Sequence, residues 1–469
     1  MTYGASQAIG RGANWLLLTG VALLLGPTHY GQVALLVAVE GITTSVLLLG
    51  QNRVIIRYLS APDYALSGFR TCLYTWARVA IPTSIAALSA ILIFGHHADS
   101  GHWMASWALL VFATLLLQLQ ELYWSYLRAR DQAGAFASSQ LLFFSLKCAL
   151  VLGFGATLKD PIAYPLGLVG AAVIVASIRR KTLAQALTGP FHAGLARSYL
   201  KFGWPFAFHS LAGALLMYAD RFILQVMSGT KAVGEYTFAY SIGSCLAFLY
   251  GAAALWFEPY LYRLSSVKES ERDLSSYTAM QVLVAASAAG AILGSLNMLA
   301  NHGALGAYLP SLPIVPIVLG AHLMQPLYLQ AHYRLAIHER TGLIMRGSLV
   351  AAVTNILANL FLIPVAGMRG AGFATLIGML GLIGTTTYAS LAASKSVTGL
   401  SIERPAKVDL LFVPCVLAGL LVAVSANIVA QSVILVALAI TAGSQVRRLR
   451  VGMRGKGVIA DHWADVQTG

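Results

Sequence analysis

The sequence that decides the fold reads AIGRGANWLLLTGVALLL over residues 8–25, GPTHY over 26–30 and GQVALLVAVEGITTSVLLLG over 31–50. The two outer segments are mostly apolar, and each has about the 20 residues that an α-helix needs to cross a bilayer. The short segment between them leaves room only for a tight reversal of the chain. The stretch therefore predicts two membrane-spanning helices joined by a short loop.

The rest of the chain is also mostly apolar and carries few charges. Of its 469 residues 58% are apolar and only 10% are charged, whereas soluble domains carry about 25% charged residues. This excludes a soluble globular protein. The net charge of +14 is carried by residues that flank apolar runs, where they orient the spans, so no nucleic-acid partner is expected. The four cysteines are far apart in the sequence, and no disulfide framework or zinc site is expected.

Further apolar spans lie along the whole chain. They are placed near residues 76–94, 103–127, 135–156, 161–178, 203–226, 233–257, 276–300, 308–332, 343–366 and 370–392. The stretch Lys407 to Ser444 is too long for one straight helix and predicts two short crossings. We predict an all-α polytopic membrane protein with about 14 transmembrane helices. Its parts are an N-terminal six-helix lobe (1–178), a cytoplasmic linker (179–201), a C-terminal six-helix lobe (202–394), two additional transmembrane helices (395–444) and a basic cytoplasmic tail (445–469).

The distribution of cations sets the expected orientation. With the N-terminus in the cytoplasm, only Lys159, Lys231 and Arg369 of the 31 Lys and Arg residues fall on the outer side, and Lys147 and Arg221 fall inside spans. All the others are cytoplasmic, as the positive-inside rule requires. Both termini are therefore expected in the cytoplasm. The external loops are too short to hold an enzyme domain.

Two passages resemble each other at an offset of 203 residues, which aligns Gly31 with Gly234. The first is GPTHYG (26–31) and the second is SGTKAVGEY (228–236), and each joins an odd span to an even one. Parallel repeats with a binding site at their interface are a common plan among transporters. Short glycine turns between unrelated helix pairs are the alternative.

Several motifs, taken together, are similar to those of the polysaccharide flippases of the multidrug/oligosaccharidyl-lipid/polysaccharide exporter superfamily. They are LGPTHYG (25–31), GQNRVIIRY (50–58), YADRFIL (218–224) with VGEY (233–236), and NILANLFLIPVAGMRGAG (355–372). The resemblance covers residues from about 8 to 392. One departure is that Leu23 and Leu24 stand where the family often has a basic residue.

The resemblance implies a flippase of the bacterial inner membrane that moves undecaprenyl-pyrophosphate-linked oligosaccharide for surface polysaccharide synthesis by alternating access. It implies a lipid-linked substrate, H⁺ or Na⁺ as coupling ion, a polysaccharide polymerase and its chain-length machinery as partners, and no cofactor. Two alternatives stay open: a cation-coupled multidrug exporter of the same superfamily, and a membrane glycan polymerase or ligase. Because no hydrolase, zinc-protease or nucleotide-binding motif occurs, we expect no enzymatic activity, no catalytic residue and no metal.

Cations inside spans are the first candidates for the pyrophosphate, since a buried charge costs about 2.5–3.5 kcal/mol on insertion scales. Lys147 has no acidic neighbour in its span and requires a carboxylate from another helix or an anionic ligand. Arg221 is the second candidate, although a local ion pair with Asp220 is the alternative. Arg53 and Arg57 follow the second span and are expected to capture the pyrophosphate at the cytoplasmic side, unless they only set the topology.

Three acidic residues, Asp220, Glu40 and Glu121, are candidates to bind the coupling ion. Asp220 is the first choice, because a phosphate that competes for Arg221 would link ligand binding to protonation. A hydrogen bond to a neighbouring helix is the alternative for Glu40. For the sugars we expect contacts from Tyr240 and Tyr250, which share one face of the eighth span, and from Gln118 in a polar stripe of the fourth.

Overall fold

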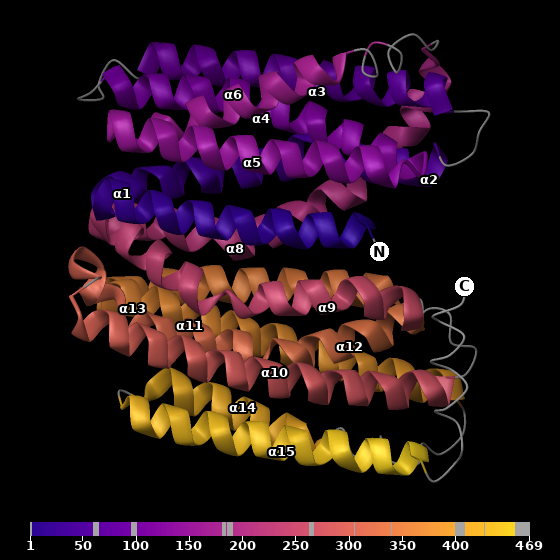
Figure 1. Cartoon of the computed structure of the whole chain (residues 1–469). Helices are drawn as coiled ribbons and strands as arrows, with labels where there is room; N and C mark the ends of the chain where they lie inside the picture. The colour runs from indigo at the N-terminus through magenta and orange to yellow at the C-terminus, as the bar shows by residue number, and fades with distance from the viewer. Residues whose placement is uncertain are drawn as a thin grey trace. The chain divides into compact units, whose positions relative to one another are not determined.

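The computed structural model describes residues 2–59, 65–94, 101–180, 184, 191–261, 267–303, 305–338, 340–398, 409–425 and 427–454. These residues form α-helices, a short 3₁₀ helix and connecting turns, without a strand. Figure 1 shows the helices along the chain. They are α1 (Thr2–Leu47), α2 (Gln51–Tyr58), α3 (Ala65–Phe94), α4 (Gly101–Ala129), α5 (Ala133–Leu158), α6 (Ala163–Ile178) and α8 (Ala193–Gly243). There follow α9 (Leu246–Leu261), α10 (Val267–Asn301), η3 (Gly306–Ser311), α11 (Ile314–Leu323), α12 (Gln325–Ile337), α13 (Thr341–Thr398), α14 (Asp409–Val424) and α15 (Ile428–Arg454).

Three of the helices are bent, and each bend lies at a glycine. The φ angle is 73° at Gly26 in α1, 81° at Gly229 in α8 and 54° at Gly367 in α13. A side chain would disfavour these left-handed conformations, which glycine adopts freely. Each of the three helices therefore has two arms. In α1 and α13 the arms correspond to two expected spans.

Two expected spans are interrupted. The span placed at 233–257 consists of the second arm of α8 and then α9, with a turn between Gly243 and Leu246. The span placed at 308–332 consists of η3, α11 and most of α12, with Met324 between α11 and α12. The last apolar stretch forms two helices as expected, and Asn427 begins α15 by accepting a hydrogen bond from the Val429 backbone N–H (2.8 Å).

Within the described residues, eight helices are long and apolar enough to cross a membrane. The apolar parts of α6, α14 and α15 are shorter. These lengths confirm the predicted all-α, polytopic membrane fold. The helix α8 begins at Ala193, inside the expected linker, and α15 continues to Arg454, inside the expected tail.

The chain divides into two compact units. Unit 1 comprises Met1–Ser241 and the segment Asn359–Ala371, and unit 2 comprises Ile242–Ala358 and Gly372–Gly469. In unit 1, α5 packs along α1 and α6, while α2 and α3 pack against α4. In unit 2, α10 packs along α15 and α11 packs against α14, around a core of aliphatic side chains. Unit 1 includes most of α8, which the sequence assigns to the second lobe. The boundaries of the two six-helix lobes stay a prediction.

Candidate functional site

A connected group of polar and aromatic side chains lies inside unit 1, and we call it the polar cluster. Its members come from both arms of α1, from α5 and α6 and from both arms of α8. They are Asn14, Glu40, Lys147, Tyr164, Tyr218, Asp220, Arg221, Tyr236 and Tyr240. The cluster unites five of the residues predicted from the sequence as ligands of the pyrophosphate, the coupling ion or a sugar, and four others that contact them.

Lys147 of α5 is a buried cation in this cluster, with 5% of its surface exposed. Its Nζ donates a hydrogen bond to Oδ1 of Asn14 (2.8 Å) and lies 5.4 Å from the centroid of the Tyr164 ring. Among the described residues no carboxylate forms an ion pair with Lys147. The charge is therefore held by an amide oxygen and the face of an aromatic ring.

Glu40 of α1 lies on the other side of Tyr164. The Tyr164 hydroxyl donates a 2.6 Å hydrogen bond to Oε2 of Glu40, and Glu40 is half-buried. Its charge acts on Lys147 without direct contact. One tyrosine thus touches the cation with its ring and the carboxylate with its hydroxyl.

Asp220 and Arg221 of α8 are bound to each other. Arg221 Nη1 lies 2.9 Å from Asp220 Oδ1, which also accepts the Arg221 backbone N–H (2.8 Å). The Tyr236 hydroxyl donates to Asp220 Oδ2 (2.5 Å). Both carboxylate oxygens of Asp220 are therefore occupied. This is the local ion-pair network that the sequence left open as the alternative.

Aromatic rings surround the Arg221 guanidinium and connect it with Glu40. Arg221 Cζ lies 4.9 Å from the centroid of the Tyr240 ring and 5.3 Å from that of Tyr218. The Tyr218 ring in turn packs against Gly41, where an added Cβ would overlap it. Since Gly41 follows Glu40 in the chain, Tyr218 lies between the two halves of the polar cluster.

A second group of charges lies where α2 packs against α4. Arg128 Nη2 is 3.4 Å from Glu121 Oε1, and the charge of Arg53 also acts on Glu121. The helix α2 buries Val54 and Ile55 and exposes Arg53 and Arg57. Arg57 Cζ lies 4.9 Å from the centroid of the Phe202 ring at the start of α8. The predicted residues Arg53, Arg57 and Glu121 are thus separate from the polar cluster.

Two predicted sugar contacts lie outside the polar cluster. Gln118 of α4 is fully buried and accepts a 2.8 Å hydrogen bond from the Trp76 indole N–H. Tyr250 of α9 belongs to unit 2, is 3% exposed and donates its hydroxyl to the His322 backbone oxygen (3.0 Å). The turn between α8 and α9 separates Tyr250 from Tyr240, so they do not lie on one continuous helix face.

Sequence reasoning did not assign a role to Asn14, Tyr164 or Tyr218. Tyrosines near the ends of apolar spans are ordinary interface anchors, and this pattern also favours an anchor at Tyr236, which the structure buries completely. The available signal was Asn14, a polar side chain inside an apolar span. Its partner Lys147 is 133 positions away in the chain.

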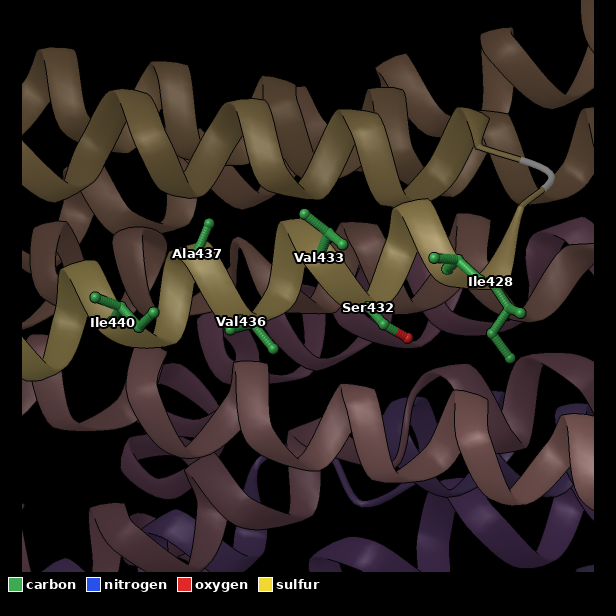
Figure 2. Close-up of a pocket in the computed structure, with 7 residues that line it drawn as sticks. Ile428, Ser432, Val433, Val436, Ala437 and Ile440 are labelled. Atoms are coloured by element: carbon green, nitrogen blue, oxygen red, sulfur yellow. The ribbon is translucent and has the colours of Figure 1, made fainter.

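An apolar groove runs along α15 in unit 2 (Figure 2). Its lining comes from one face of the helix, with Ile428, Val429, Val433, Val436, Ala437 and Ile440 as apolar members and Ser432 as the polar one. Such a face suits hydrocarbon and presents no charge to a phosphate. The candidate site is therefore the polar cluster.

The fold of the chain matches solved structures of membrane transporters. An inward-facing multidrug resistance MATE family transporter of the MOP superfamily is similar with a TM-score of 0.63 and 15% identity, over 82% of this chain and 95% of its own. The lipid II flippase MurJ in an inward closed conformation is similar with a TM-score of 0.62 and 12% identity, over 96% of this chain and 99% of its own. The class that this fold defines is an all-helical, multi-pass membrane protein.

The family within that class follows from the sequence. The family described as "Polysaccharide biosynthesis protein" matches residues 1–264, which is more than half of the chain. The chain belongs to this family, and the family predicted from the motifs is confirmed. A search of curated proteins found no significant match.

Proposed function

We propose that the chain is a flippase of the bacterial inner membrane, with both termini in the cytoplasm. Its substrate is an undecaprenyl-pyrophosphate-linked oligosaccharide for a surface polysaccharide, and it moves the headgroup outward by alternating access coupled to an H⁺ or Na⁺ gradient. Membership in the polysaccharide biosynthesis family and the fold shared with the lipid II flippase support this proposal. A polysaccharide polymerase and its chain-length machinery are the proposed partners.

The observation that carries the proposal is the burial of Lys147 without an ion-paired carboxylate. A buried charge is costly unless a charged partner and hydrogen bonds compensate it. An ammonium group offers three N–H donors, and the only hydrogen bond that Lys147 donates within the described residues goes to Asn14. A phosphate oxygen would supply the missing negative charge.

The other predicted residues take supporting roles in the proposal. Arg221 binds Asp220 through Nη1, and its guanidinium has further N–H donors for a second phosphate. The exposed Arg53 and Arg57 capture the headgroup at the cytoplasmic side. Tyr240 contacts a sugar, and Gln118 and Tyr250 do so in conformations that expose them. Glu40, Asp220 and Glu121 are the candidates for the coupling ion.

A cation-coupled multidrug exporter is the second candidate, because the MATE transporters share the fold. A buried ammonium without a carboxylate partner disfavours a cationic drug at this site. The test is transport by the purified protein in liposomes. Labelled polyprenyl-pyrophosphate-linked oligosaccharide should cross from one leaflet to the other faster than in protein-free vesicles. Export of a cationic dye without glycan flipping would establish the exporter instead, and glycan chain elongation would establish a polymerase.

A further inference from the structure

We propose that the exposed face of α3 carries a binding site for an anionic phospholipid, in which Arg78 binds the lipid phosphodiester and Tyr74 positions Arg78. The site lies outside the polar cluster. It holds a lipid that stays in its leaflet, so the inference does not depend on which substrate the chain moves.

The helix α3 presents one long face to its surroundings. Within the described residues, it is the least buried of the eight helices that are long and apolar enough to cross a membrane. Arg70, Tyr74 and Arg78 are all exposed, and their spacing of four residues places them on one face of the helix. Ile81 and Ile85 are exposed and continue this face at helical spacing. A basic end and an apolar end therefore follow each other along one helix face.

Arg78 lies near the boundary between lipid headgroups and hydrocarbon. About 20 helical residues cross the hydrocarbon, and counted back from the end of α3 at Phe94 they reach Thr75. Arg78 is therefore one turn inside that boundary. Side chains on a helix tilt toward its N-terminus, and Arg78 Cζ lies 4.6 Å from the centroid of the Tyr74 ring, one turn closer to the headgroups. The guanidinium thus reaches back to the level of the lipid phosphates.

A cation at the edge of the hydrocarbon requires a negatively charged partner. Among the described residues no carboxylate forms an ion pair with Arg78, and α3, α2 and residues 191–201 contain no Asp or Glu. Glu121 of the neighbouring α4 is already paired with Arg128. An anion from outside the protein would supply the missing charge. A headgroup with a net negative charge suits this basic surface better than a zwitterionic one.

Tyr74 holds the Arg78 guanidinium in place. The Tyr74 ring also packs on the ring of Phe191, with 4.5 Å between the centroids. The backbone N–H of His192 donates a 3.2 Å hydrogen bond to Thr71 Oγ1, one turn before this contact. The segment directly before α8 is therefore docked on α3 and supports the Tyr74 ring. A guanidinium stacked on a ring keeps its N–H donors available for two phosphate oxygens.

The ligand that fits this surface has a phosphodiester, no cationic group and apolar chains, as phosphatidylglycerol has. Its phosphate binds Arg78, and its acyl chains lie along the face of Ile81 and Ile85. Arg70, exposed two turns before Arg78, adds positive charge at the level of the headgroup. Inorganic phosphate shares the charge but lacks the chains, so it should bind this surface much more weakly.

The test is native mass spectrometry of the purified protein in detergent, titrated with phosphatidylglycerol or with phosphatidylcholine of the same acyl chains. It gives the dissociation constant of the first lipid bound. Inorganic phosphate and a short-chain polyprenyl pyrophosphate are added as competitors in separate titrations. Thermal unfolding of each variant in lipid-free detergent measures whether the fold is intact.

We expect the native protein to bind its first phosphatidylglycerol at least about tenfold more tightly than phosphatidylcholine. Arg78→Gln should lose this preference, and Arg78→Lys should keep part of it, because the charge remains without the planar fork of donors. Tyr74→Leu should weaken the preference, while Tyr74→Phe retains the ring and should restore it. Arg130→Gln is the control, since Arg130 is an exposed arginine of unit 1 that Asp131 follows in the chain. All these variants should unfold at the native temperature.

Each contrary result has a separate meaning. Equal affinities for the two lipids in the native protein, or a native preference in Arg78→Gln, would refute the site. Displacement of the lipid by inorganic phosphate at equal concentration would show an anion site without a role for the acyl chains, and would also refute it. Tighter binding of the polyprenyl pyrophosphate at Arg78 would assign this surface to the substrate and overturn the inference, while the proposed function stands. A lipid preference as expected, together with failure of glycan flipping in liposomes, would count against the proposed function alone.

Discussion

Gly31 and Gly234 lie in direct backbone contact, although they are 203 positions apart in the chain. A Cβ on Gly31 would overlap the carbonyl oxygen of Thr230, and a Cβ on Gly234 would overlap that of Pro27. Pro27 and Thr230 are separated by the same 203 positions, as are the bend glycines Gly26 and Gly229. The contact is therefore symmetric: the equivalent turns of the two repeats pack against each other through equivalent atoms. Within unit 1, this pairing supports the internal repeat that the sequence indicates.

The symmetric contact predicts that Gly31→Ala and Gly234→Ala destabilise the protein. The added methyl group meets backbone atoms that a rotamer change cannot move, and overpacking of this kind costs about 1–3 kcal/mol. Thermal unfolding of the purified protein in detergent should show a lower midpoint for both variants. Gly213→Ala is the matched control in the same helix α8, because nothing lies within 4 Å of its Cβ position. Unchanged midpoints in both test variants would contradict the close contact.

Lys147→Ala should abolish glycan flipping in liposomes while the protein still folds, because the pyrophosphate loses its buried cation. Lys147→Arg should retain part of the rate, since the charge remains but the hydrogen-bond geometry with Asn14 changes. Lys201→Ala, an exposed lysine of α8, serves as the control. A native flipping rate in Lys147→Ala would remove this residue from the mechanism.

The Asp220–Arg221 pair predicts a stability effect that depends on which partner is removed. Asp220→Ala leaves a buried guanidinium without its carboxylate, and such a loss costs about 3–5 kcal/mol. The double variant Asp220→Ala/Arg221→Leu should unfold at a higher temperature than Asp220→Ala alone, because no unpaired charge remains. Additive losses in this double-mutant cycle would show that the two residues do not stabilise each other.

The exposed arginines of α2 predict an effect of ionic strength. Arg53→Gln/Arg57→Gln should lower the initial flipping rate at low substrate concentration, and added salt should slow this variant less than the native protein. The rate at saturating substrate should change little, since the arginines act on capture. Arg180→Gln, another exposed arginine of unit 1, is the control. An unaltered salt dependence in the double variant would exclude a role in capture.

Topology can be checked with single cysteines in a variant without the four native ones. Thr28→Cys, exposed beside the bend of α1, should react with a membrane-impermeant maleimide added outside the cell. A cysteine placed after Arg450 should react only when the membrane is opened. Labelling of the C-terminal position from outside would contradict the even number of crossings.

The features that follow from local sequence were predictable. The spans follow from apolar length, the bends from glycine turns and the burial of Lys147 from its place inside an apolar run. The partners of these residues were not predictable, because Tyr164 and Glu40 are 124 positions apart, and Asn14 and Lys147 are 133 apart. Helical periodicity describes which residues share one face, and it carries no signal of which face of another helix lies opposite.

The second arm of α1 and the turn that follows it touch α8 at three glycines. Gly31 meets Thr230 and Gly234, Gly41 meets the Tyr218 ring, and Gly50 meets Gly203, so the contacts run in antiparallel order. With contacts at both ends and in the middle, this arm cannot tilt away from α8 at one end without breaking the others. The two helices should therefore move together as one rigid body that includes both Glu40 and Arg221. A movement of this rigid body changes the surroundings of the Glu40 carboxylate and of the Arg221 guanidinium at the same time.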